Sequence, residues 1–203
     1  MTSSRRATIV RMLLWVAAPI LLLAILRPWT VRPLEGGKPV AFDAATFASS
    51  AWPRIVREAD GRATDVSEIP ADGTVPAARV VKGSGVVSAV DRQSRAGVML
   101  VRLSGDRQTI VAIQIGPVIR GTALRDASGF IHFSDFTNQS DYAAAANALN
   151  DAALRTVVAP LAVDTLPGRT VVFAGAVGKT ARREDGAIEV VPVRLEVAAA
   201  GIK

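Results

Sequence analysis

The apolar and polar positions in the second half of the chain form a pattern of short strands. From Ala78 onward, runs rich in β-branched residues alternate with clusters of Gly, Asp, Ser and Arg, which is typical of strands joined by turns. Glycines within the first run favour a bulge or a strong bend there. Residues 129–136 are a candidate for a short extra strand. The runs predict five main strands, at residues 79–90, 98–103, 109–115, 169–177 and 187–197.

Between the third and fourth runs, the apolar spacing becomes that of a helix. We expect this helix to start from a cap at Asn138 or Ser140 and to run to about Val158. One face is apolar, so it should pack on the sheet. The apolar positions are Tyr142, Ala146, Leu149, Ala153 and Val157.

A second helical pattern precedes the strands, at residues 40–58. We expect Pro53 to stop or kink this helix, because proline lacks a backbone N–H and its ring clashes with the preceding turn. The next stretch, residues 58–76, is polar and rich in Asp, Gly and Pro. It is predicted to be a loop with one helical turn near residues 65–69.

Three strands, a helix and two further strands form the element order of an OB-type barrel. We therefore predict a mainly β (α+β) fold, an OB-like small β-barrel with a helix between strands 3 and 4. An N-terminal transmembrane helix and a short helical segment would precede it, and a β-sandwich with one helix is the alternative. The predicted divisions are a membrane anchor (or uncleaved signal segment) and linker at 1–38, a helical and loop lead-in at 39–77, and the barrel domain at 78–203.

The N-terminal region contains the longest apolar run. Residues 12–26 would span about 22 Å as a helix, against a hydrocarbon core of about 30 Å, and adding residues 9–10 lengthens the run. No pair of small residues suited to signal peptidase follows it, which favours an uncleaved anchor over a cleaved signal. We expect residues 9–26 to cross the bacterial inner membrane once, with the C-terminal domain in the periplasm.

Positive charge is concentrated in the same region. Residues 1–38 contain six basic residues and one acidic residue, whereas the net charge of the whole chain is +6. The remainder is nearly neutral, and no predicted strand interleaves aromatic with basic residues, so we expect no nucleic-acid partner. The sequence has no cysteine, which excludes disulfides, thiolate metal sites and lipid attachment at cysteine within it.

No motif in the sequence predicts a cofactor or a metal. Two segments resemble phosphate-binding loops, but Thr122 replaces the lysine in one and Phe173 replaces the first glycine in the other. His132 is the only histidine, so a cluster of histidine ligands is excluded, and a structural strand residue is the favoured interpretation. We expect no catalytic set, although a hydrolase would use Asp126, Asp135 or His132.

Polar residues from two turns and one helix are candidates for a ligand-binding or partner-binding site. The turns combine Arg with Asp, and the planar guanidinium group suits carboxylates, phosphates or sugar hydroxyls. An internal Arg–Asp network that fixes the loops is the favoured interpretation of these residues, and a binding site is the alternative. Amides in an Ala-rich helix suggest hydrogen bonds to the loop at 116–126. The candidates are Asp91, Arg95, Arg120, Thr122, Arg125, Asp126, Asn138, Gln139, Asn147 and Asn150.

Three motifs carry a family resemblance: GSGVVSAVDRQSRAG at 83–97, QIGPVIRGTALRD at 114–126 and FIHFSDFTNQ at 130–139. Together they resemble the DUF2291 family of predicted bacterial periplasmic lipoproteins, over roughly residues 40–198. That family has no established activity, but its members are often encoded beside sugar ABC transporters, which implies an accessory role in the envelope. The lipoprotein label implies a cysteine, so the lack of one makes a helical anchor the expected attachment.

These features predict a non-enzymatic, membrane-anchored periplasmic accessory protein associated with a sugar ABC-transport system. Its expected partners are the inner membrane and components of the ABC transporter or a solute-binding protein. A module that binds a small ligand, a sugar or a carboxylate, is the alternative. A hydrolase is the less favoured third hypothesis.

Overall fold

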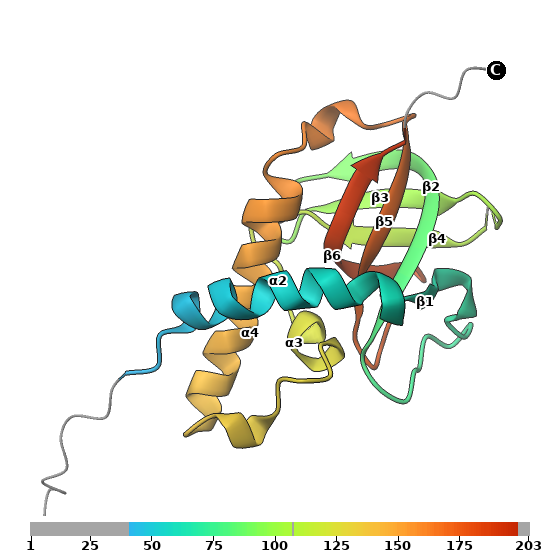
Figure 1. Cartoon of the computed structure of the whole chain (residues 1–203). Coiled ribbons are helices and arrows are strands. Elements are labelled where there is room, and N and C mark those ends of the chain that lie inside the picture. Colours follow the sequence, from blue (N-terminus) through green and yellow to red (C-terminus); the bar gives the residue numbers. More distant parts are fainter. Residues whose placement is uncertain (1–40, 107, 199–203) are drawn as a thin grey trace, which may run out of the picture. The chain divides into compact units, whose positions relative to one another are not determined.

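The strands of the computed structural model lie close to the predicted runs (Figure 1). The structure describes residues 41–106 and 108–198. A two-residue strand, β1 (Thr64–Asp65), precedes the predicted ones and pairs in parallel with β2. All five predicted strands are confirmed, and no end is displaced by more than one residue. They are β2 (Arg79–Asp91), β3 (Val98–Leu103), β4 (Ile110–Gln114), β5 (Thr170–Val177) and β6 (Ile188–Val197).

Five of the strands pair in a closed circuit. The order in the sheet is β1-β2-β3-β4-β6-β5, and β2 pairs with β5 as well as with β3. Within the circuit only β4 and β6 run parallel, and the other pairs are antiparallel. A helix, α4 (Gln139–Ala153), lies between β4 and β5 in the chain, so the predicted element order and the mixed α+β class are confirmed.

The long strand β2 belongs to both sides of the circuit because it bends. Residues 79–86 pair with β5 and residues 85–91 pair with β3, with a shift of register after Val87. At Gly85 a side chain would collide with the carbonyl oxygen of Arg102 on β3, so only glycine fits there. The predicted bulge in a glycine-containing strand is therefore confirmed.

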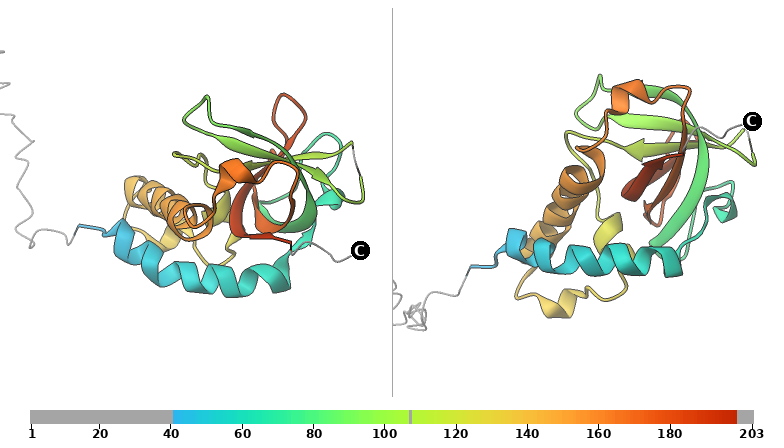
Figure 2. Two further views of the ribbon diagram at one scale, coloured as in Figure 1. Left: turned by 90° about the horizontal axis from the view of Figure 1, so that it is seen from above. Right: turned by 45° about the horizontal axis from the view of Figure 1, so that its top comes forward.

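The helices gather on one side of the strands (Figures 1 and 2). α2 (Ala44–Arg62) packs across α4, and the short α3 (Ala123–Ala127) contacts both α4 and β5. A π-helical turn, Leu154–Val158, continues α4, which confirms the predicted extent of this helix. Asn138 caps it as predicted, because its side-chain oxygen accepts a hydrogen bond from the Asp141 backbone N–H at 2.9 Å.

The prediction that the first helix ends by residue 58 is wrong, since α2 continues through Pro53 to Arg62. Apolar residues are buried on both sides of the proline, including Trp52 before it and Ile55 after it. This packing offsets the hydrogen bond that proline removes. The predicted loop at 58–76 therefore starts inside a helix, but its single helical turn is confirmed as a 3₁₀ helix at Val66–Glu68.

The extra strand predicted at 129–136 is also wrong, because the structure has a 3₁₀ turn there, Phe133–Asp135. The Asp135 carboxylate accepts a hydrogen bond from the His132 backbone N–H at 2.9 Å, which satisfies the backbone locally. His132 is accordingly an exposed residue at the start of a turn and not a strand residue.

Two large apolar clusters, and a third that comprises only Val98, Ala112 and Ala187, hold the fold together. The first fills the inside of the strand circuit, where Phe173 and Val101 are fully buried. The second lies between the helices and the outer side of the strands, and it includes Trp52, Leu149 and Val191. Together they fix the helices, and with them the connection from β4 to α4, against the strands.

Within residues 41–106 and 108–198, no helix is long and apolar enough to cross a membrane. The predicted membrane-spanning segment, residues 9–26, lies outside the described residues.

Candidate functional site

The chain leaves β4 through a loop, residues 115–122, that a buried glutamine holds in place. Gln114 is 2 % exposed. Its side-chain oxygen accepts a hydrogen bond from the Arg120 backbone N–H at 2.7 Å, and its Nε2 donates to the Arg120 carbonyl oxygen at 3.3 Å. Both backbone groups of Arg120 are therefore satisfied by one side chain. Gln114 was not predicted from the sequence, because a lone amide at a strand end gives no signal of its role.

A second buried amide, Asn150 of α4, holds the same loop from the helix. Its Nδ2 donates to the carbonyl oxygens of Ile119, at 3.4 Å, and Gly121, at 2.9 Å. The predicted hydrogen bonds from helix amides to this loop are thus confirmed for Asn150. Asn147, three residues earlier, is exposed and does not take part.

Arg125 and Asp126 form an internal network that braces the start of α3. Nη2 of Arg125 lies 2.7 Å from Oδ1 of Asp126, and Nη1 donates to the Tyr142 carbonyl oxygen at 3.0 Å. The guanidinium carbon also lies 3.5 Å from the centroid of the Tyr142 ring. The other oxygen of Asp126 accepts a hydrogen bond from the Thr122 hydroxyl at 2.6 Å. For Arg125, which is only 8 % exposed, the structural interpretation therefore fits.

An open pocket of about 580 Å³ lies beside this loop. Its volume is within the range of small-molecule sites. The lining comes from four parts of the chain: the loop and α3, the residues before β2, the end of β5, and β6. The lining residues are Ala77, Ala78, Arg120, Gly121, Thr122, Ala123, Asp126, Ala176, Gly178, Lys179, Thr180, Glu189 and Val191.

Three predicted candidates, Arg120, Thr122 and Asp126, meet in this pocket. Two charged residues that the sequence analysis did not propose join them, namely Lys179, just after β5, and Glu189 of β6. Arg120, Lys179 and Glu189 have no ion-pair partner within the described part of the chain. The pocket therefore presents charged groups that are available to a ligand.

The turn at 91–97 meets the loop through its backbone and not through its charged side chains. The Arg95 carbonyl oxygen accepts a hydrogen bond from the Val118 N–H at 2.9 Å. The Asp91 carboxylate instead accepts a hydrogen bond from the Gln93 N–H within its own turn, at 2.9 Å. Asp91 and Arg95 are exposed and do not line the pocket, and the same holds for the predicted candidates Asn138, Gln139 and Asn147.

The hydrolase candidates do not share this pocket. Asp126 lines it, whereas His132 and Asp135 lie on the exposed 3₁₀ turn and are not among its lining residues. Among the residues that the structure describes, no three His, Asp or Glu side chains gather as metal ligands.

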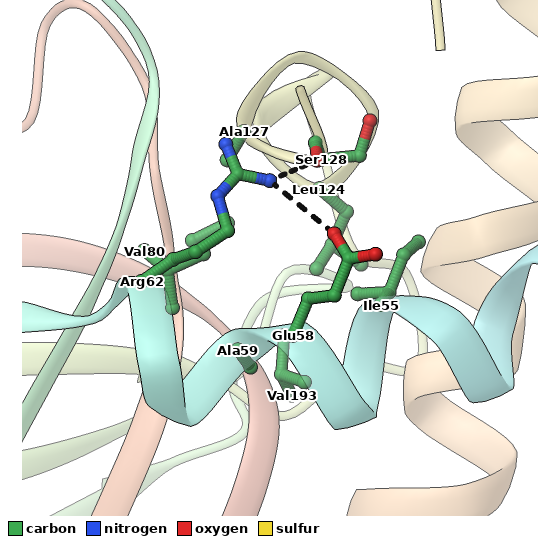
Figure 3. Close-up of a pocket in the computed structure, with 10 residues that line it drawn as sticks. Ile55, Glu58, Ala59, Arg62, Val80, Leu124, Ala127, Ser128 and Val193 are labelled. Atoms are coloured by element: carbon green, nitrogen blue, oxygen red, sulfur yellow. Dashed lines mark hydrogen bonds and ion pairs between the residues drawn. The ribbon is translucent and has the colours of Figure 1, made fainter. Parts of the chain in front are cut away.

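A smaller crevice lies under α2, shown in Figure 3, and it is a packing gap. Its volume is about 10 Å³, which is about the space of one water molecule. Arg62 reaches across it to donate a hydrogen bond to the Ser128 carbonyl oxygen, and Glu58 lies 3.9 Å from the same guanidinium group. The hydrogen bond from Arg62 to Ser128 links α2 to the residue after α3, whereas the Glu58–Arg62 pair lies within α2.

The pairing of the strands and the helix between β4 and β5 place this protein among mixed α+β proteins with an OB-like fold. An OB-fold protein from Thermotoga maritima, known from its crystal structure, superimposes with a TM-score of 0.59 and 18 % sequence identity, covering 77 % of this chain and 99 % of that one. An OBody bound to hen egg-white lysozyme matches with a TM-score of only 0.33 and 17 % identity, over 67 % of this chain and 93 % of that one. No curated protein matches the sequence.

The chain belongs to the DUF2291 family, described as predicted periplasmic lipoproteins, whose model matches residues 20–196. The predicted family is therefore confirmed. The family description agrees with a periplasmic location and attachment to a membrane. The 203 residues contain no cysteine, the residue to which the lipid of a lipoprotein is attached.

Proposed function

We propose that this protein is a non-enzymatic periplasmic accessory protein that binds a small polar ligand in the pocket beside the loop at 115–122. The observation that carries the proposal is the meeting of Arg120, Thr122 and Asp126 with Lys179 and Glu189 around one open pocket. Ligand sites combine a small number of well-placed polar groups with apolar walls, and this pocket has both.

The loop that forms one wall is held by two buried amides, Gln114 and Asn150. A wall fixed before a ligand arrives loses little conformational entropy on binding, so the loop is suited to recognition. A hydrolase is less favoured, because Asp126 has neither His132 nor Asp135 beside it in the pocket.

Two finer features belong to the same proposal. The closed circuit of β2, β3, β4, β6 and β5 supports describing the domain as a small OB-like barrel. The apolar run at residues 9–26 supports a single-pass anchor in the inner membrane, with residues 78–203 in the periplasm.

A variant that fills the pocket tests ligand binding directly. Ala123 lines the pocket, so Ala123→Trp should block it, whereas Ala143→Trp, on an exposed position of α4, should not. Calorimetry of the detergent-solubilised full chain against glucose, glucuronate and N-acetylglucosamine should give a binding signal that Ala123→Trp abolishes and Ala143→Trp preserves. Equal binding by both variants would place the ligand elsewhere and refute the proposal.

Association with a sugar ABC-transport system is a second candidate role, and one surface favours it. Pro117 and Val118 are exposed at the outer end of the loop, Val118 by 45 %, next to the exposed Arg95. A transporter component or a solute-binding protein would dock there, outside the pocket. Pull-downs from solubilised membranes with the wild-type protein and with Val118→Asp test this role, which fails if the wild type recovers no transport component.

A further inference from the structure

The charges around the pocket are unbalanced once internal ion pairs are counted. Four charged residues line it: Arg120, Lys179, Asp126 and Glu189. The charge of Asp126 is neutralised by the buried Arg125, whose Nη2 lies 2.7 Å from Oδ1 of Asp126. Oδ2 of Asp126 accepts a hydrogen bond from the Thr122 hydroxyl. Two cationic side chains then face one carboxylate, so the pocket carries an excess of one positive charge.

We infer that this pocket selects a small polyhydroxylated acid, a ligand with one carboxylate at one end and hydroxyl groups along the rest. Arg120 and Lys179 bind the carboxylate, and Glu189 accepts hydrogen bonds from the hydroxyls. This inference rests on the proposed function, and it adds the chemical class of the ligand.

The backbones that carry the three charged side chains are each fixed by hydrogen bonds. The N–H and carbonyl groups of Arg120 both bond to Gln114. The Lys179 carbonyl oxygen accepts a hydrogen bond from Val75 at 3.0 Å, and the Glu189 N–H donates to Ala181 at 2.7 Å. Each charged side chain therefore projects from a backbone position that is fixed by hydrogen bonds.

The rest of the lining leaves room for a compact ligand. The apolar part of the lining has small side chains, which keep the volume near 580 Å³: Ala77, Ala78, Ala123, Ala176 and Val191. Such walls fit the carbon face of a monosaccharide-sized molecule, while the rim supplies the polar contacts.

The chemistry of the three charged groups explains the choice of a single carboxylate. The planar guanidinium of an arginine binds a carboxylate through two parallel hydrogen bonds, and lysine adds a point charge. An ionised carboxylate such as that of Glu189 only accepts hydrogen bonds, so it suits hydroxyl donors and repels a second carboxylate. A neutral sugar would leave both cations unpaired, and a dicarboxylate would meet Glu189.

Calorimetry of the detergent-solubilised full chain with glucuronate, glucose and glucarate tests this inference. We expect glucuronate to bind at least about tenfold more tightly than either glucose, which lacks the carboxylate, or glucarate, which has a second one. Arg120→Gln and Lys179→Gln should each weaken glucuronate binding about tenfold, whereas Arg57→Gln, on an exposed position of α2 outside the pocket lining, should leave it unchanged. Glu189→Gln should improve glucarate binding relative to glucuronate.

The outcomes separate this inference from the proposed function. If glucose binds as tightly as glucuronate and Ala123→Trp abolishes both signals, the pocket binds ligands but the charge selection is refuted. Glucarate binding as tightly as glucuronate refutes it too. If none of the three compounds binds, or if Ala123→Trp has no effect, the proposed function fails and the inference fails with it.

Discussion

Nδ2 of Asn150 lies 2.9 Å from the carbonyl oxygen of Gly121, and this hydrogen bond links α4 to a loop 29 residues earlier in the chain. The same nitrogen donates to the Ile119 carbonyl oxygen. Asn150 is 2 % exposed and Ile119 is 6 % exposed, so the Ile119 carbonyl group depends on this amide where water has little access. The position of the loop that forms one wall of the pocket is therefore set by the packing of α4.

Removing this amide should destabilise the protein. Asn150→Ala leaves the Ile119 and Gly121 carbonyl oxygens without their donor, which should lower the free energy of unfolding by about 1–3 kcal/mol. Asn147→Ala changes the same residue type at an exposed position of α4 and should have almost no effect. Urea unfolding of both variants measures the difference, and equal stability would show that the hydrogen bonds contribute nothing net.

Gln114 and Asn150 should be energetically coupled, because both hold residues 119–121. Gln114→Met keeps the approximate volume but removes both hydrogen bonds to Arg120, at an expected cost of about 1–3 kcal/mol. Once one amide is lost, the freed loop makes poorer bonds to the other. The double variant should thus lose less than the sum of the single losses by at least about 0.5 kcal/mol, whereas strict additivity in urea unfolding would argue against a shared loop.

Arg125 should contribute to stability through the internal network that it forms. Arg125→Met removes the ion pair to Asp126 and the hydrogen bond to the Tyr142 carbonyl, with an expected loss of about 1.5–3 kcal/mol. Arg155→Met, an exposed position in the π-helical turn, is the matched control and should be nearly neutral. Thermal unfolding compares the two, and an Arg125→Met protein as stable as the control would show that this network is dispensable.

The elements that the sequence predicted well are those set by local pattern. The run at 98–103 is mostly apolar and lies between two turn clusters, and the helix after Asn138 has both a cap and apolar spacing, so neither needed tertiary information. The end of the first helix was predicted wrongly because proline usually ends a helix. Here the buried apolar residues on both sides of Pro53 stabilise the helix beyond it. Residues 129–136 were wrongly predicted to be a strand. A side-chain hydrogen bond satisfies the backbone there without a partner strand.

The residues of the candidate site likewise fall into those that a local motif predicts and those that depend on tertiary structure. Arg120, Thr122 and Asp126 belong to one short motif, residues 114–126, so this motif alone was enough to propose them together. Lys179 and Glu189 reach the pocket only through the register of β5 and β6 with their neighbours, and a pairing register cannot be read from a lone charged residue. The internal role of Arg125 follows from its stacking on Tyr142, which depends on where α4 lies.

Acid should reveal the contribution of Asp65 to stability. Hydrogen bonds from the Ser67 hydroxyl and backbone N–H lower the pKa of Asp65 below its ordinary value. Because the folded-state pKa is the lower one, this carboxylate stabilises the protein above about pH 4, and the contribution is lost as the pH falls through the folded-state pKa. The melting temperature of Asp65→Asn should lie below that of the wild type at pH 6, and the two should converge near pH 2. A constant offset across this range would mean that the effect is not one of ionisation.

Gly116 and Gly121 should tolerate alanine to different degrees, although both have positive φ, +75° and +85°. At Gly121 nothing lies within 4 Å of an added Cβ, so Gly121→Ala meets only the left-handed backbone penalty of about 1–2 kcal/mol. At Gly116 the same atom would lie 2.5 Å from Cδ2 of Leu154, and overpacking should add about 1–3 kcal/mol.

A third substitution isolates the clash. In a Leu154→Ala background the obstructing side chain is gone, so Gly116→Ala should cost about 1–3 kcal/mol less than in the wild type, with only the Val118 nitrogen left close to the added Cβ, at 3.2 Å. Urea unfolding of the four proteins in the Gly116/Leu154 cycle gives the coupling energy. If Gly116→Ala costs the same with and without the Leu154 side chain, the loop does not depend on close packing against the end of α4.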